Sequence, residues 1–107
     1  MHRLPPALAA SATTRILELL GDGPGRVLEL GFAGIHAQPL ELAGWDVVVV
    51  EPDPSHALRA RERGAQVAAG AAGQFDAVVA PSDANLDGID AERILLVERD
   101  GSVRELR

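Results

Sequence analysis

The chain has 107 residues, a formal net charge of −6 and 47% hydrophobic residues, which predicts one folded domain over residues 1–107 with a buried core. Its ten cations are all arginine and lie among acids, so nucleic-acid binding is disfavoured, and the absence of lysine excludes Schiff-base chemistry. The absence of cysteine excludes disulfides, thiolate zinc sites and cysteine nucleophiles.

The N-terminal residues lack the continuous apolar stretch of a signal peptide. No apolar run in the sequence approaches the roughly 20 residues that are needed to span a bilayer. Because cysteine is also absent, we expect a cytoplasmic protein that does not enter a membrane.

A helix is predicted over residues 6–20, where apolar residues recur every fourth position. Two prolines fit the start of this helix, and Gly21 fits its end. Residues 22–25 are rich in glycine and proline and are predicted to turn. The segment 1–25 is therefore expected to be an N-terminal helix and turn, followed by the sheet core over 26–107.

A first strand is predicted over residues 26–31, followed by a glycine-containing loop over 32–38. Pro39 fits the first turn of a short helix that ends near Gly44. The clearest strand covers residues 46–51, where four consecutive valines do not alternate with polar residues. Such a run is typical of a strand that is covered on both faces, as in a parallel sheet.

The next segment carries the start and stop signals of a helix. Asp53 is expected at the N-cap and Pro54 at the first helical position. The helix is predicted to run to about Arg63, and Gly64 suits the position just after its end.

The remaining apolar runs are short and predict strands. Residues 81–92 are expected to form a loop, and Asp100-Gly101 a hairpin turn. The strands are predicted over residues 65–69, 75–80, 93–98 and, returning antiparallel, 103–106. Alternating strands and helices indicate an α/β fold, a small, doubly wound and mostly parallel sheet of Rossmann type with a C-terminal antiparallel hairpin strand.

Ligands of such sheets bind at the carboxyl ends of strands, near the point where the strand order reverses. Gly31 permits a tight turn and a close ligand approach there, although a simple turn also accounts for it. Glu51, twenty positions later, could accept hydrogen bonds from ribose hydroxyls. Its alternatives are a solvated carboxylate or a charge that favours the next helix. The spacing and the valine run favour the ribose contact.

Two short motifs carry a family resemblance, Val-Leu-Glu-Leu-Gly at 27–31 and Val-Val-Val-Glu-Pro-Asp-Pro-Ser at 48–55. They resemble class I S-adenosylmethionine-dependent methyltransferases, in which an acidic, glycine-rich loop contacts the methionine part of the cofactor and a second acid holds its ribose. The resemblance spans nearly the whole chain and implies S-adenosylmethionine as the cofactor. The cofactor-binding residues that it implies are Glu29, Gly31, Phe32, Ala33, Gly34, Glu51 and Pro52.

Several positions depart from the pattern of that family. Ala33 and Ile35 stand where the family has its second and third loop glycines, and residues 70–71 supply no acid after the third strand. After the fourth strand, Asp83 and Asn85 could act on a substrate, but such residues more often form turns. No catalytic residue is therefore assigned.

The histidines do not indicate a metal site. His36 lies in the candidate loop and could act as a base, but the favoured interpretation is a solvated loop residue. His2, His36 and His56 have no metal-ligand spacing, so no metal is predicted. A dinucleotide-binding loop would need glycines in place of Ala33 and His36, which disfavours NAD.

Two functional hypotheses follow from the sequence. The first is an S-adenosylmethionine-binding, methyltransferase-like protein of unidentified acceptor, whose substrate pocket a homodimer or a partner protein would complete. The second is a non-catalytic Rossmann module for protein association that has lost cofactor binding. An open pocket lined by Glu51 would favour the first, and a pocket filled by Phe32 or Ile35 the second.

Overall fold

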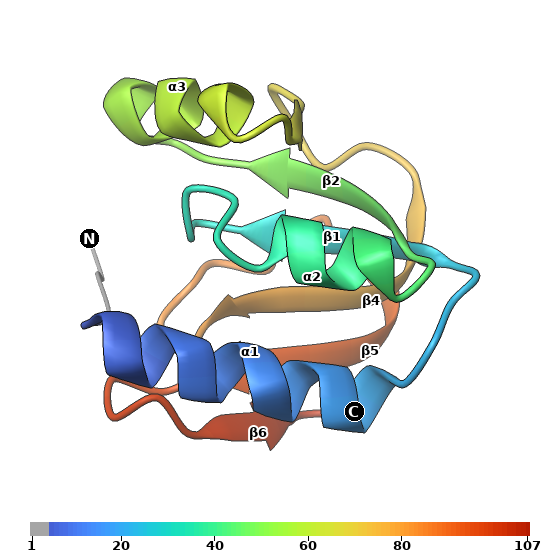
Figure 1. Cartoon of the computed structure of the whole chain (residues 1–107). Helices are drawn as coiled ribbons and strands as arrows, with labels where there is room; N and C mark the ends of the chain where they lie inside the picture. The colour runs from blue at the N-terminus through green and yellow to red at the C-terminus, as the bar shows by residue number, and fades with distance from the viewer. Residues whose placement is uncertain (1–4) are drawn as a thin grey trace.

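The computed structural model describes residues 5–107, so His2 lies outside the described residues. The helices and strands follow the predicted order along the chain (Figure 1). They are α1 (Pro6–Leu20), β1 (Arg26–Leu30), α2 (Ala37–Leu42), β2 (Asp46–Val50), α3 (Pro54–Glu62), β3 (Gln66–Val67), β4 (Gln74–Pro81), β5 (Asp90–Val97) and β6 (Val103–Glu105).

The strands form one sheet in the order β3-β2-β1-β4-β5-β6. All neighbouring strands are parallel except β5 and β6, which pair antiparallel. The mostly parallel α/β sheet with an antiparallel C-terminal strand is therefore confirmed. The chain order reverses between β1 and β4, and this places the ligand-binding region of such sheets at the carboxyl ends of these two strands.

The two faces of the sheet are covered differently. On one face, strand residues such as Val79 and Leu95 pack in a core cluster with residues of all three helices, which are Ile16 of α1, Leu40 of α2 and Ala60 of α3. Figure 1 shows α1 and α2 on the same side of the sheet. The other cluster consists of strand side chains packed against loop residues, and no described helix contributes to it. Its members from the strands and loops include Leu28, Val78, Ile94, Leu96, Ala71, Ala84 and Leu86.

The valine strand is buried on both faces, as its composition predicts. Val47 and Val49 belong to the helix-covered cluster, and Val48 belongs to the loop-covered one. A strand that packs on both faces has no solvent side, so its sequence does not alternate between apolar and polar residues.

Helix α3 begins and ends as predicted. The Asp53 carboxylate accepts hydrogen bonds from the backbone N–H groups of Ser55 and His56 at 2.9 and 3.3 Å, which caps the start of the helix. Pro54 occupies the first helical position. Gly64 has φ +86°, the left-handed conformation that favours glycine after a helix end.

Strand β5 begins earlier than the sequence predicts. It starts at Asp90 rather than at residue 93, because it pairs with the whole of β4 from Gln74↔Asp90 onward. Because charged residues lie at this start, the apolar pattern alone does not predict the first residues of the strand. Arg93 in its interior is paired with Glu105 of β6 at 2.8 Å, which lets a charged side chain lie on the sheet.

Among residues 5–107, no helix combines the length and the apolar character that a membrane span requires.

Candidate functional site

A cavity of about 550 Å³ lies at the carboxyl ends of β1, β2 and β4, where the topology of the sheet predicts a ligand site. Its wall is formed by Leu30, Gly31, Glu51, Pro52, Asp53, Pro81, Asp83, Ala84 and Asn85. The cavity therefore brings together three of the residues implied by the family resemblance, which are Gly31, Glu51 and Pro52.

The sequence did not identify four of the lining residues, Leu30, Asp53, Pro81 and Ala84. Asp53 and Pro81 follow or end strands that flank β1, so the strand order would have indicated them once it was known. Asp83 and Asn85, weighed as substrate contacts, also lie on the wall. The Asn85 side chain accepts a hydrogen bond from the Asp87 N–H at 2.9 Å, the turn-forming role expected of it.

Phe32 and Ile35 leave this cavity open. Phe32 is buried in the helix-covered core, where its ring meets that of His36 edge-on at 4.9 Å between centroids. Ile35 lines a separate cavity of about 340 Å³ between the loop and the end of α3. The side chains that could have filled the candidate site thus point elsewhere.

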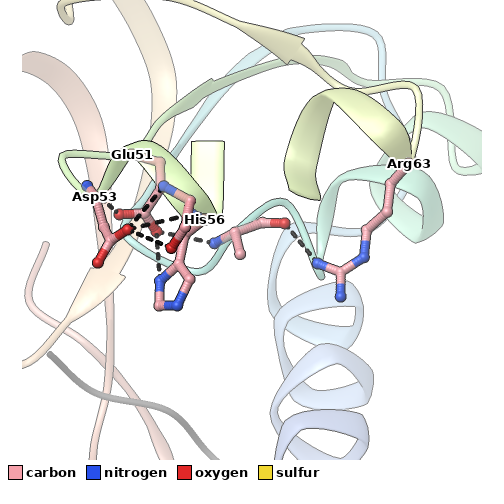
Figure 2. Close-up of polar contacts among 6 residues, drawn as sticks. Glu51, Asp53, His56 and Arg63 are labelled. Carbon is pink, nitrogen blue, oxygen red and sulfur yellow. Dashed lines mark hydrogen bonds and ion pairs between the residues drawn. The ribbon is translucent and has the colours of Figure 1, made fainter. Parts of the chain in front are cut away.

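Ala33 adopts a conformation that favours glycine. Its φ is +52°, which costs a residue with a Cβ about 1–2 kcal/mol. Two hydrogen bonds hold it there, one from its N–H to Glu51 Oε1 at 3.1 Å and one from Arg63 Nη1 to its carbonyl at 2.6 Å (Figure 2). The second loop glycine of the resembled family is thus replaced by a residue that keeps a glycine-like geometry.

Gly34 is required for packing against α3. It has φ +75°, and a Cβ added to it would lie 3.1 Å from the Cβ of Ala60 and 3.4 Å from that of Ala65. It does not line the 550 Å³ cavity. This glycine therefore lets the loop approach the helix, and its absent side chain makes no room for a ligand in that cavity.

The Glu51 carboxylate is enclosed by three groups. Oε1 accepts from the Ala33 N–H and lies 4.0 Å from His56 Nδ1, and Oε2 accepts from the Asp53 N–H at 3.1 Å. Figure 2 shows Asp53 and His56 gathered around it. Only 1% of the Glu51 side chain is exposed. Both carboxylate oxygens are therefore satisfied by the protein itself in this conformation.

Glu29 lies inside the protein and supports the loop. It is fully buried, and its Oε1 accepts a hydrogen bond from the His36 N–H at 2.8 Å. Burial raises the pKa of Glu29 to about 7, against the opposing effects of the backbone N–H groups of His36 and Gly34. Glu29 is absent from the cavity wall, so it can act on a ligand there only through the loop.

The prediction that His36 is a solvated loop residue is wrong. His36 is fully buried, and its Nδ1 lies 2.6 Å from Thr13 Oγ1 of α1. Because the Thr13 hydroxyl donates to the Ala9 carbonyl at 3.0 Å, we assign the proton of this contact to Nδ1. Burial lowers the pKa of His36 to about 4, so the ring is neutral and does not reach the cavity as a base.

The described residues contain no group of three or more histidine, aspartate or glutamate side chains that could hold a metal ion. Two buried polar atoms, Glu29 Oε2 and His36 Nε2, have no hydrogen-bond partner among the described residues. Both belong to the support of the loop, and neither residue lines the cavity.

The fold resembles that of a solved methyltransferase. No known protein family matches the sequence, and no curated protein does. The crystal structure of the glycopeptide N-methyltransferase MtfA aligns with a TM-score of 0.60 and 21% identity over 82% of this chain. The same enzyme complexed with S-adenosyl-L-methionine gives 0.55 and 23% over 68%, and its sinefungin complex gives 0.56 and 22% over 70%.

These alignments cover 52%, 40% and 40% of the respective MtfA chains, so the present chain matches about half of that enzyme. At this level of identity the likeness establishes the methyltransferase-like fold, and function has to be argued from the site.

Proposed function

We propose that the chain is an S-adenosylmethionine-binding, methyltransferase-like protein and that the cofactor occupies the 550 Å³ cavity. The observation that carries the proposal is this cavity, which opens at the strand-order reversal beside Gly31 and Glu51. Its volume falls within the range of about 300–1,000 Å³ that is usual for small-ligand sites. The similarity to an enzyme solved with S-adenosyl-L-methionine supports the same assignment.

The charge of the wall suits this cofactor. The lining residues include three acidic residues, Glu51, Asp53 and Asp83, and no arginine. Hydrogen bonds from Ser55 lower the pKa of Asp53, so its carboxyl stays ionised near neutrality. Such a wall repels phosphate groups and attracts a cation, which favours a sulfonium nucleoside over a dinucleotide.

The roles of the implied residues follow from their positions. Gly31, with φ +82°, leaves the end of β1 open to a ligand, and Glu51 would accept hydrogen bonds from the ribose hydroxyls, next to Pro52. Glu29 and the Phe32–Gly34 segment would shape the loop without touching much of the cofactor. The bound cofactor would supply an activated methyl group.

Methyl transfer would depend on positioning. The wall holds no histidine and no cysteine, so an acceptor would have to be aligned with the methyl donor by the cavity. We further propose that a second copy or a partner protein completes the acceptor site. We also propose a cytoplasmic location, which the absence of cysteine supports.

One observation favours the alternative, a non-catalytic association module that has lost cofactor binding. The Glu51 carboxylate is almost completely enclosed, and the backbone N–H groups of Ala33 and Asp53 satisfy its oxygens. A carboxylate used only to hold its own loop would have this geometry.

Calorimetric titration with S-adenosylmethionine and S-adenosylhomocysteine separates the two functions. We expect micromolar binding by the parent chain and binding at least about tenfold weaker in Glu51→Gln, which loses charged hydrogen bonds. Glu62→Gln, an exposed change in α3, is the matched control and should bind like the parent. The absence of both heat and a thermal shift at millimolar ligand, with the parent shown to be folded, would overturn the cofactor proposal and leave the association module as the hypothesis to test.

A further inference from the structure

The carboxylate that the proposed function assigns to the ribose is closed to a ligand in this structure. With 1% of the Glu51 side chain exposed, its oxygens offer almost no surface to a hydroxyl. At least one of the groups that enclose it must therefore move before a ribose can bind. The groups in hydrogen-bond contact are the N–H of Ala33 and the N–H of Asp53, whereas the His56 ring lies 4.0 Å from Oε1 without a hydrogen bond.

Asp53 is the less mobile of the two. Its carboxylate accepts hydrogen bonds from the Ser55 N–H, the Ser55 hydroxyl and the His56 N–H, so it is tied to the first turn of α3. Ala33 lies in a loop and has a strained φ of +52°. Relaxation of this strain favours movement of Ala33 away from Glu51.

Both ends of this loop are fixed, which confines the movement to Ala33. The Gly31 N–H donates to the Val50 carbonyl at 3.0 Å. Gly34 packs closely against Ala60 of α3. Between these two fixed points, Ala33 makes two backbone hydrogen bonds. Its N–H donates to Glu51, and its carbonyl accepts from Arg63.

We infer that Arg63 is a positioning residue that keeps the Ala33 peptide closed over Glu51, so that displacement of this peptide opens the carboxylate to a ligand. The inference rests on the proposed function, because it takes Glu51 as the ribose contact. Arg63 acts from the end of α3 through the Ala33 carbonyl, at 2.6 Å, and is absent from the cavity wall. Its removal should therefore change the accessibility of Glu51 and leave the cavity lining intact.

The test compares Arg63→Met with Arg61→Met, which removes a neighbouring exposed cation from the last turn of the same helix. Arg63→Met should accelerate hydrogen exchange of the Ala33 amide by about 3- to 10-fold, the effect of losing one solvent-exposed charged hydrogen bond. S-adenosylhomocysteine should bind more tightly by a similar factor, because the binding-competent fraction rises. Arg61→Met should match the parent in both measurements, and Arg63→Lys should lie between.

Faster exchange at Ala33 together with tighter binding supports the inference. Unchanged exchange overturns it, because Arg63 then does not hold the peptide. Faster exchange with unchanged or weaker binding also overturns it, because the peptide then does not obstruct Glu51. If neither the parent nor any variant binds S-adenosylhomocysteine, the proposed function fails. Hydrogen exchange of the Ala33 amide that is still faster in Arg63→Met shows that this failure lies in ligand binding and not in the contact between Arg63 and the Ala33 peptide.

Discussion

The two faces of the sheet are buried to a similar extent but by different means. Leu95 and Val79 pack against the three helices, whereas Leu96 and Val78 are covered by the loops that connect β3, β4 and β5. Helices are held by their own backbone hydrogen bonds, whereas loops can move inward when a buried side chain is shortened. Equal burial should therefore not give equal stabilisation, and neighbouring residues of one strand can test this difference.

The largest effect is expected from a pair of truncations in β5. Leu95→Ala removes a fully buried side chain beneath the helices and should lower the free energy of unfolding by about 3–5 kcal/mol. Leu96→Ala, with 5% exposure on the loop-covered face, should cost about 2–3 kcal/mol, because the loops can partly close the space. Urea unfolding of both variants measures the two losses.

The dependence of the unfolding free energy on urea concentration is the control for this pair, since an unchanged slope shows that both variants unfold from a native-like state. Equal losses would mean that the loops pack as rigidly as the helices. The distinction between the two faces would then be one of secondary structure alone.

Local pattern and chain order predicted much of this architecture. The apolar repeat predicted the bounds of α1, and Asp53 with Pro54 predicted the start of α3, because caps and periodicity act over a few residues. The start of β5 depends on its pairing with β4, which no local pattern contains.

The same limit applies to the candidate site. Gly31 and Glu51 were found because they directly follow strands in recognisable motifs. The burial of His36 was missed because it depends on Thr13, 23 residues away. The enclosure of Glu51 was missed because it depends on how the loop at Ala33 folds back. Strand ends can be read from one segment, but contacts between segments cannot.

The helix-covered side also encloses two titratable groups whose effects on stability should oppose each other. Burial raises the pKa of Glu29 from 4.5 to about 7 and lowers that of His36 from 6.5 to about 4. Between about pH 4.5 and 6.5, the folded state binds more protons than the unfolded state at Glu29 and fewer at His36. The parent chain should therefore show a weak pH dependence from this pair.

Substituting either member should reveal the other. In Glu29→Gln, His36 remains, so the free energy of unfolding should fall as the pH drops from 6.5 to 4. In His36→Gln, Glu29 remains, so it should fall as the pH rises from 4.5 to 7. Each change is at most roughly 3 kcal/mol over its window, and urea unfolding at half-unit pH intervals measures it.

The opposite signs are the decisive feature of this experiment. Glu62→Gln, an exposed change in α3, controls for the loss of one negative charge and should keep the pH profile of the parent. Slopes of the same sign in Glu29→Gln and His36→Gln would show that the two groups are not buried together as neutral species.

The smallest effect concerns the loop itself. Ala33→Gly should raise the free energy of unfolding by about 0.5–1 kcal/mol, because glycine adopts φ +52° without the cost of a Cβ. Ala10→Gly, at an exposed position of α1, is the matched control and should lower it by about 1 kcal/mol. Thermal unfolding of both variants gives the signs. A loss of stability in Ala33→Gly would mean that Ala33 does not hold a left-handed conformation in solution. The hydrogen bond from its N–H to Glu51 would then require a different conformation of the loop.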